Sequence, residues 1–473
     1  MECFTVYTDE VEGRIDPFYY KPLFVKLIRK IKKSNFGFVR FGEIIQDISG
    51  GATPRIEGDF YSYSGIPFLR VQNITEEGIN LEDVKFIKKE VHEKMLKRSQ
   101  LHENELVFTI TGRIGSVAVV PKNFAGNINQ HSVRIKLKEY FNNNQILPEY
   151  IALFFNLKIG QILSFRETTG GTRPALDYEA IKDLVIPFPD MQKQKELVDK
   201  TKQVYSLKQS KEAEALKLLD SLNDYVLDEL GIKLPELKDK MVYIVNSEDV
   251  QNKRADAYYY QPKFEELEKA IKKGKFEVIV FDKLITDLKN GVEIRTYSEN
   301  GYRYLRVTDL GKCGVNDNDP RYVVAEEIPP KIRLGNNSFL ISRSGSLGLV
   351  STVKDKIINC ILSSHIFKVD LDTDKITPEY LEAFFRSILG QIQFFRNNNG
   401  GVVPEIDQSA LKSLTVVIPP LSIQNKIAEE VKARMKKAEQ LQKEAKEELD
   451  RAKQEVEKMI LGNVVSSPIF SRQ

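Results

Sequence analysis

The sequence predicts an α+β protein in which two similar globular α/β domains are separated by two long antiparallel helices that form a coiled coil. Three observations lead to this fold class. Short motifs recur in the same order in both halves of the chain, which indicates a pseudo-two-fold internal repeat. Each half mixes strand-like runs with helical ones, and each then enters about forty residues without proline or glycine.

The internal repeat is the strongest of these observations. The opening R-I-D-P-F-Y-Y-K-P, from Arg14, returns as R-A-D-A-Y-Y-Y-Q-P from Arg254. The further matched segments, in order, are 68–71 with 304–307, 111–115 with 344–348, 147–155 with 377–385, and 185–192 with 417–424. Because partners stay about 230–240 residues apart, a duplication explains them better than chance.

Each half has the same two-part organisation. Runs such as L-V-F-T-I-T (106–111) and V-R-I-K-L (133–137) predict strands, whereas 147–156 and 175–184 have helical spacing. The expected parts of the chain are a first globular domain at 1–188, a long helix at 189–232, a linker at 233–253, a second globular domain at 254–419, a second long helix at 420–462 and a tail at 463–473.

The two long helices begin after Pro189 and Pro420 and end near Gly231 and Gly462, which is the usual placing of these residues at helix ends. Forty residues predict a rod of about 60 Å. An apolar seam at alternating steps of three and four residues predicts that the helices pack on each other. The seam residues are Val204, Leu207, Ala215, Leu218, Leu222, Tyr225 and Leu230, then Ile427, Val431, Met435, Ala438, Leu441, Ala445, Leu449, Ala452, Val456 and Met459.

Composition narrows the class of protein. Three scattered cysteines without C-x-x-C spacing fit a reducing cytoplasm, and four histidines show no metal-binding spacing, so no metal or cofactor is expected. We expect no signal peptide and no membrane partner, because the chain has no apolar run long enough for a span. Seventy basic against 67 acidic residues leave only +3, so nucleic-acid binding would have to depend on local basic loops.

The whole arrangement resembles the DNA-specificity (S) subunit of type I restriction-modification systems. The resemblance rests on the two R-x-D-x-x-Y-Y-x-P openings, the S-G-G-A-T-P loop (49–54), G-I-P-F-L-R-V (65–71) and the T-T-G-G-T-R-P run (168–174) before L-V-I-P-F-P. It covers nearly the whole chain. The second half departs from it, with K-N-G-V-E-I-R in place of S-G-G-A-T-P and V-V-P (402–404) in place of T-R-P.

The resemblance implies a non-catalytic protein in which each globular domain is a target-recognition domain for one half of a bipartite site in double-stranded DNA. The helices would set the gap and dock two methyltransferase (modification) subunits, to which restriction subunits can add. No enzyme motif opposes this, because neither Pro-Pro pair follows an asparagine and T-G-R-I-G-S (111–116) is not a nucleotide loop. The alternative is a coiled-coil interaction scaffold whose globular domains bind a ligand other than DNA.

Loop arginines are the first candidates for DNA contact, since the guanidinium fork matches the major-groove edge of guanine. Hydroxyls and a glutamine in the same loops could bind phosphate or adenine. The candidates are Thr53, Arg55, Arg70, Thr111, Arg113, Gln130, His131, Arg166, Thr172 and Arg173 in the first half, and Arg295, Arg306, Arg343, Ser344, Ser346, His365, Arg396 and Asn398 in the second. The competing interpretations are solvated arginines, turn residues and, for Arg70 and Arg306, structural ion pairs.

Overall fold

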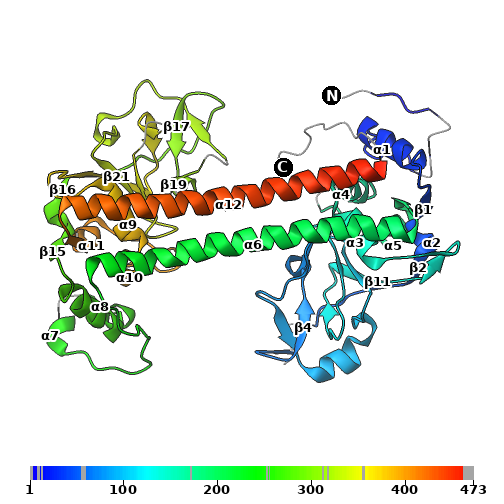
Figure 1. Cartoon of the computed structure of the whole chain (residues 1–473), viewed down its shortest axis with the longest axis horizontal. Coiled ribbons are helices and arrows are strands. Elements are labelled where there is room, and N and C mark those ends of the chain that lie inside the picture. The colour runs from blue at the N-terminus through cyan, green and yellow to red at the C-terminus, as the bar shows by residue number, and fades with distance from the viewer. Residues whose placement is uncertain are drawn as a thin grey trace. The chain divides into compact units, whose positions relative to one another are not determined.

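The computed structural model describes residues 4–7, 11, 14–54, 60–170, 173–251, 254, 256–311, 314–316, 319–353 and 357–461. The chain divides into two compact units: unit 1 comprises Met1–Gln209 and Ala445–Gln473, and unit 2 comprises Ser210–Glu444. Two long helices, α6 (Met191–Leu230) and α12 (Leu421–Leu461), each contribute one segment to each unit (Figure 1).

Unit 1 combines small sheets with short helices. Its elements, besides the segments of α6 and α12, are α1 (Pro22–Lys32), β1 (Phe38–Arg40), α2 (Phe41–Ile44), β2 (Ile45–Gly50), β3 (Tyr61–Ser62), β4 (Ile66–Leu69), η2 (Val71–Asn73), β5 (Ile74–Thr75), β6 (Gly78–Ile79), β7 (Lys85–Ile87), η3 (Val91–Met95), η4 (Lys97–Ser99), β8 (Leu106–Thr109), β9 (Val117–Val119), β10 (Asn127–Ile128), β11 (Ser132–Leu137), β12 (Tyr140–Phe141), β13 (Asn144–Gln145), α3 (Pro148–Asn156), α4 (Lys158–Arg166), α5 (Tyr178–Asp183) and β14 (Val185–Pro187).

The main sheet of unit 1 has the strand order β2-β11-β8-β9 and is antiparallel throughout. Its strand β8 is buried along its whole length. Leu106 and Phe108 pack into the cluster that includes Phe155, while Val107 packs into a second cluster with Leu69. Because successive side chains of a strand point to opposite faces, β8 is covered on both sides. The second sheet, β10-β4-β7-β3, lies on the side of the second cluster.

Unit 2 is built in the same order. Its elements are α7 (Ser247–Val250), η5 (Tyr258–Tyr260), α8 (Pro262–Lys272), β15 (Glu277–Val280), η6 (Phe281–Leu284), β16 (Ile285–Asn290), β17 (Tyr302–Leu305), η7 (Val307–Asp309), β18 (Leu310–Gly311), β19 (Gly314–Val315), β20 (Arg321–Val323), η8 (Pro330–Ile332), β21 (Ser338–Ser342), β22 (Val350–Thr352), β23 (Cys360–Leu362), β24 (Ile366–Leu371), α9 (Pro378–Arg386), α10 (Ile388–Arg396), α11 (Gln408–Lys412) and β25 (Thr415–Ile418).

The sheets of unit 2 repeat those of unit 1. The order β16-β24-β21-β22 corresponds to β2-β11-β8-β9, and β20-β17-β23 corresponds to β7-β4-β10. The fully buried β21 again divides its side chains between two clusters, Phe339 and Ile341 on one side and Leu340 on the other. The predicted fold class, two similar α/β units with long helices and an internal repeat, is confirmed.

A buried tyrosine fixes the same helix in each unit. The hydroxyl of Tyr150 donates to the carbonyl of Pro187 at 2.7 Å, and that of Tyr380 donates to Val417 at 2.7 Å. Burial raises the pKa of both phenols, so both remain protonated and act as donors. These bonds attach α3 and α9 to the strand that leads into each long helix.

The R-x-D-x-x-Y-Y-x-P openings are held by internal hydrogen bonds in each unit. Asp16 accepts from the amide of Tyr19 and pairs with Arg14, and the hydroxyl of Tyr20 donates to the carbonyl of Arg14. Tyr19 and Tyr20 are buried. The bonds between Asp256 and Tyr259 and between Tyr260 and Arg254 repeat this arrangement in unit 2.

The long helix α6 begins and ends with identifiable caps. The side chain of Asp190 accepts from the amide of Lys193 at 2.8 Å, which satisfies a free donor of the first turn. At the other end Gly231 has φ +66°, and the amide of Ile232 donates to the carbonyl of Leu227 at 2.9 Å. A left-handed glycine with this bond is a common helix stop.

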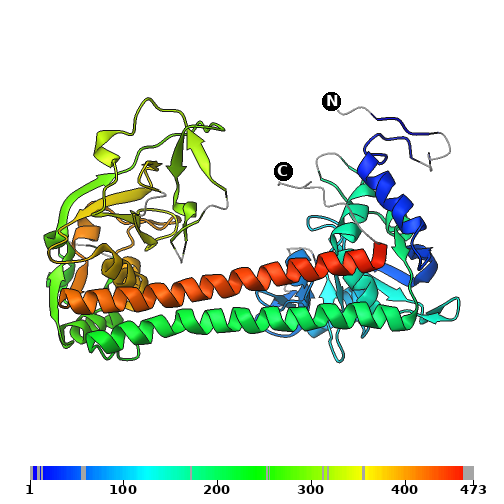
Figure 2. The same cartoon turned by 45° about the horizontal axis from the view of Figure 1, so that its top comes forward.

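Within each unit the segments of α6 and α12 lie side by side and run antiparallel, as Figures 1 and 2 show. In unit 2, Glu229 pairs with Lys426 at 2.6 Å and Lys211 pairs with Glu444 at 2.9 Å. In unit 1, Lys200 pairs with Glu455 at 2.8 Å. Residue numbers fall along α6 as those of their partners rise along α12, so the predicted antiparallel coiled coil is confirmed within both units.

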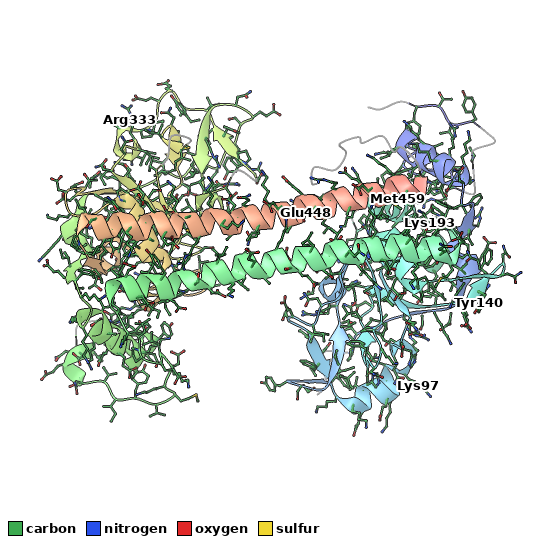
Figure 3. The ribbon with its side chains drawn as sticks, viewed as in Figure 1. Lys97, Tyr140, Lys193, Arg333, Glu448 and Met459 are labelled. Atoms are coloured by element: carbon green, nitrogen blue, oxygen red, sulfur yellow. The ribbon has the colours of Figure 1, made fainter. Side chains whose placement is uncertain are left out.

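The seam of α12 is as predicted, and the predicted seam of α6 needs one correction. Nine of the ten predicted α12 positions are buried, and Met459, labelled in Figure 3, is half-buried. On α6, however, Leu207 is 45% exposed. Next to it, Lys208 pairs with Glu77 in the turn between β5 and β6 at 2.6 Å, and Lys211 pairs across the seam with Glu444 of α12 at 2.9 Å.

A carboxyl group of α12 holds the start of a short helix in unit 1. Glu457 is buried and accepts from the amide of Ile159 in the first turn of α4 at 3.1 Å. In unit 2 the side chain of Asn223, on α6, accepts from the amide of Ile388 in α10 in the same way, at 2.7 Å. Burial raises the pKa of Glu457, and this outweighs the amide of Ile159 and the nearby lysines, which lower it.

This raised pKa predicts a pH dependence of stability. An acid whose folded-state pKa lies above its unfolded value stabilises the fold fully below the unfolded pKa, and this contribution is lost as pH rises through the folded pKa. Glu457→Gln keeps an acceptor without the charge, so we expect it to remove that loss of stability. Urea unfolding between pH 4 and 8 measures the effect.

Glu455→Gln is the matched control, because the hydrogen bond from Lys200 lowers the pKa of Glu455 and the sign reverses. That contribution is present above the unfolded pKa and lost as pH falls through the folded one. Equal pH profiles for the wild type and Glu457→Gln would contradict the assignment.

Candidate nucleic-acid interface

Several loops of unit 1 meet at one edge of the main sheet. Gly50, which ends β2, pairs with Val133 near the start of β11, and Thr109, which ends β8, pairs with Ser132. The loops that leave these strands therefore emerge together. A Cβ atom on Gly51 would lie 2.1 Å from the carbonyl of Asn129, so only glycine permits this approach.

Four predicted residues join in a polar chain at this edge. Thr111 bonds the Nδ1 atom of His131 at 2.6 Å, and the Nε2 atom of His131 contacts Gln130 at 3.2 Å. The oxygen of Gln130 accepts in turn from the hydroxyl of Thr53. Thr53, Gln130 and His131 are exposed. The chain thus presents hydroxyl, amide and imidazole groups in fixed relative positions.

Two predicted arginines lie in loops that flank this polar chain. Arg113 is exposed in the turn between β8 and β9, where Gly112 and Gly115 have φ +73° and +83°. Its carbonyl accepts from the hydroxyl of Thr109, and its side chain borders an open cavity of about 530 Å³. Arg173 is exposed in the loop that ends at Ala175. Ala175 forms a β-bridge with Thr111, which joins this loop to the polar chain. The predicted residues Arg55 and Thr172 lie outside the described residues.

Unit 2 has the same arrangement at the corresponding sheet edge. Ser344 bonds Nδ1 of His365 at 2.5 Å, as Thr111 does with His131. The amide of Arg343 donates to the carbonyl of His365 at 2.7 Å, and the backbones of Ser344 and Glu405 form a β-bridge. His365 is exposed, whereas Ser344 is buried. The two units therefore share a scaffold and not only a fold.

The exposed side chains on this scaffold differ between the units. At the position of Arg113, unit 2 has Ser346, which is exposed. Arg343 is held by Glu405 at 2.6 Å. Arg295 is largely exposed, at 87% of its side chain, although Glu293 lies 2.8 Å away. Among the described residues of these loops, unit 1 therefore exposes Arg113 and Arg173, whereas Arg295 and Arg343 of unit 2 each lie beside a glutamate.

Arg70 and Arg306 each form an ion pair with an aspartate, in equivalent turns of the two units. Arg70 follows β4 and pairs with Asp83 at 3.0 Å, while Arg306 follows β17 and pairs with Asp309 at 3.0 Å. The hydrogen bonds that Arg306 donates to Asp309 raise the pKa of Arg306. These pairs match the structural interpretation of both arginines, whose guanidinium groups are engaged within the protein.

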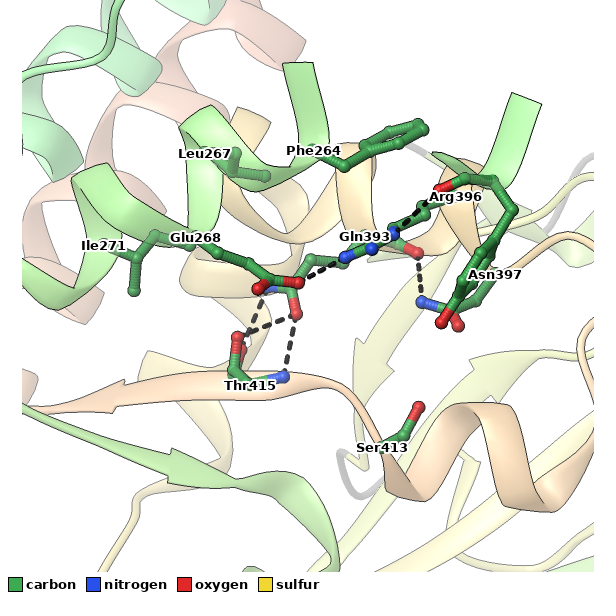
Figure 4. A pocket seen from close by; sticks show the side chains of 10 residues that line it. Phe264, Leu267, Glu268, Ile271, Gln393, Arg396, Asn397, Ser413 and Thr415 are labelled. Atoms are coloured by element: carbon green, nitrogen blue, oxygen red, sulfur yellow. Dashed lines mark hydrogen bonds and ion pairs between the residues drawn. The ribbon is translucent and has the colours of Figure 1, made fainter. Parts of the chain in front are cut away.

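Arg166 and Arg396 also take a structural role in place of the predicted DNA contact. Arg166 is buried, bonds Glu167 at 2.7 Å and lies 3.4 Å from the ring centre of Tyr19. Arg396 pairs with Glu268 beside the ring of Tyr259 and lines a cavity of about 140 Å³ (Figure 4). Both side chains hold the opening segment of their unit, because each bonds the carbonyl of the stacked tyrosine.

Asn398 has a backbone-organising role. Its side-chain oxygen accepts from the amides of Gly400 and Glu405, at 3.1 and 2.9 Å, and so closes the loop between them.

Two residues that sequence reasoning missed belong to the same scaffold. Asn129 accepts from the amide of His131 at 3.2 Å, and Glu405 fixes Arg343. The pairing of Glu405 with Arg343 has a signal in the sequence repeat. Unit 1 has Ile110 and Ala175 at the two corresponding positions, so both positions change from apolar to charged together.

Among the described residues, no group of three His, Cys, Asp or Glu side chains could hold a metal ion. No described helix is apolar and long enough to span a membrane. Of the predicted residues of unit 1, Thr53, Thr111, Arg113, Gln130, His131 and Arg173 lie on neighbouring loops with donors and acceptors. Recognition of a base edge or phosphate requires such groups.

Comparison with known proteins identifies the family. The model of the type I restriction modification DNA specificity domain matches residues 33–218 and 297–451. The type I restriction enzyme EcoBI specificity subunit of Escherichia coli is 26% identical over 160 residues, which is about a third of each chain (34% of this one, 33% of that one). The MjaVIII specificity subunit of Methanocaldococcus jannaschii is 21% identical over 449 residues, covering 89% of this chain and 91% of that one.

A solved structure described as showing complex assembly and conformational transition of the type I R-M system has the same fold. It matches with a TM-score of 0.50 at 15% identity, over 90% of this chain and 98% of that one. The fold and the loop scaffold therefore define a protein with two related recognition units. The chain belongs to the family of type I restriction-modification DNA specificity proteins.

Proposed function

We propose that this chain is the DNA-recognition subunit of a type I restriction-modification complex, in which each unit reads one half of a bipartite target in duplex DNA. One observation carries the proposal: the same loop scaffold occurs twice, at equivalent sheet edges, with different exposed side chains. A shared scaffold with different tips suits the reading of two different half-sites.

Unit 1 would read bases mainly through Arg113, Arg173 and Gln130. Arginine pairs with the O6 and N7 atoms of guanine, and glutamine with adenine. Hydroxyl and imidazole groups such as those of Thr53, Thr111 and His131 would position the backbone of the duplex. In unit 2 these tasks fall to Arg295, Arg343, Ser346 and His365.

The paired helices would set the unread gap between the half-sites and dock two methyltransferase subunits, to which restriction subunits can add. Catalysis would reside in those partners, and the subunit itself would act in the cytoplasm, where the DNA is. We retain 1–188 and 254–419 as the target-recognition domains. A scaffold that binds a ligand other than DNA is not favoured by the family.

Methylation mapping tests this proposal. The chain is expressed with its methyltransferase subunit, and genomic DNA is sequenced for methylated bases with the chain present and deleted. We expect one two-part motif with a fixed gap that disappears on deletion. Methylation that is unchanged without the chain, or that has no sequence preference, would refute the proposal.

A further inference from the structure

Unit 2 exposes two adjacent valines at the loop that corresponds to the Arg173 loop of unit 1. Val402 is 102% exposed and Val403 is 58% exposed. Single exposed apolar residues are ordinary on protein surfaces. Two adjacent exposed ones at the tip of an ordered loop need an explanation, because each would gain about 1.5–3 kcal/mol from burial.

The loop that carries the valines is held in place from several sides. The amide of Asn399 donates to the carbonyl of Glu405 at 2.8 Å, and the amide of Gly345 donates to the carbonyl of Pro404 at 3.0 Å. A Cβ atom on Gly400 would lie 2.0 Å from the carbonyl of Val403, so this turn requires glycine. Because the base of the loop is fixed, both valine side chains are held exposed to solvent. Binding to a ligand therefore requires little further ordering of this loop.

The same base supports a polar tip in unit 1. Thr169 and Ala175 exchange two backbone hydrogen bonds of 2.9 Å across the base of that loop. Between them the sequence has Thr172 and Arg173 where unit 2 has Val402 and Val403. The repeat has therefore kept the base and changed the chemistry of the tip from hydrogen-bonding and cationic to branched and apolar.

One apolar group is available for recognition in the major groove, the C5-methyl group of thymine. Short branched side chains on a fixed loop suit contact with a methyl group, since they lose little side-chain entropy on binding. The hydroxyl and imidazole of Ser344 and His365, at the base of the same loop, match the pair that flanks Arg173 in unit 1.

We propose that Val402 and Val403 form an apolar tip that reads the C5-methyl group of thymine in the half-site bound by unit 2. This inference rests on the proposed function and adds the chemical group that the second unit recognises. It also fits the pairing of Arg295 and Arg343, which each lie beside a glutamate in unit 2.

Uracil substitution tests the inference, because uracil differs from thymine only by the missing methyl group. Methylation by the complete complex is measured on duplexes in which each thymine of the target is replaced, one at a time, by uracil. We expect a loss of about fourfold per contacted methyl group at one or two positions of the half-site read by unit 2. In the Val402→Ala, Val403→Ala double variant, thymine and uracil duplexes should be methylated equally.

Val280→Ala is the control, since Val280 is 42% exposed on a strand of the same unit away from these loops. It should keep the thymine-to-uracil ratio of the wild type. Three results would overturn the inference. The half-site read by unit 2 could contain no thymine, the wild type could methylate thymine and uracil duplexes equally, or the double variant could keep the wild-type ratio. The inference would also be wrong if the double variant lost activity equally on both duplexes and no longer assembled with its partner subunits. That result would indicate that the valines contact a protein. Sequence-specific methylation that persists in these cases leaves the proposed function standing.

Discussion

Ala438→Glu is expected to cost unit 2 about 3–5 kcal/mol of unfolding free energy, because it places an unpaired charge in the helix seam. Ala438 is fully buried and packs with Ala215 and Leu441 at a point where the two helices approach closely. A glutamate there would enter a seam packed by Ala215 and Leu441, where its carboxylate loses contact with water. Denaturant unfolding followed by far-UV circular dichroism measures the loss.

Ala433→Glu is the matched control for this change. It introduces the same side chain on the same helix, but Ala433 is exposed. Alanine and glutamate have similar helix propensities, so the stability of this variant should stay within about 0.5 kcal/mol of the wild type. Equal unfolding midpoints for the two variants would show that Ala438 does not lie in a packed seam.

Arg113→Ala is expected to have the largest effect on recognition. Loss of a guanidinium that pairs with guanine costs about 1–3 kcal/mol of binding free energy and relaxes the preference at one base pair. The effect should fall on the half-site read by unit 1 and leave the other half-site unchanged. Methylation rates on duplexes carrying each base at each target position measure both the size and the place of the effect.

Arg40→Ala is the control for Arg113→Ala. Arg40 is an exposed arginine of the same unit whose guanidinium pairs with Asp183, away from the reading loops. It should leave every base preference intact. If Arg113→Ala instead weakened binding equally on all sequences and reduced the salt dependence by about one counterion, Arg113 would contact phosphate and the base-reading role would be wrong.

The fold was predictable because its signals are local and occur twice. Pro189 and Gly231 mark the ends of α6, and a seam such as Ile427, Val431, Met435 follows from residue type alone. Lys208 and Lys211 were missed because a seam read from hydrophobicity skips charged residues. Their partners, Glu77 and Glu444, lie far away in sequence, so only the fold reveals that these charges are paired.

For the candidate DNA contacts, the sequence indicated which residues to consider but not how they are arranged. Thr111, Gln130 and His131 come together because they follow or precede strands of one sheet. Arg166 was a candidate for DNA contact, but its ring contact with Tyr19 depends on a segment about 150 residues earlier in the chain. Such long-range pairing leaves no trace in the local sequence pattern.

In the proposed function, the helix pair sets the separation of the two half-sites. The most direct test of this role is a methylation map of a variant with four residues inserted in each long helix, after Gln209 and after Glu444, where the helices pass from one unit to the other. Four helical residues add about 6 Å, or about two base pairs of duplex. We expect two unchanged half-sites and a longer gap. An unchanged gap, or an altered half-site, would contradict it.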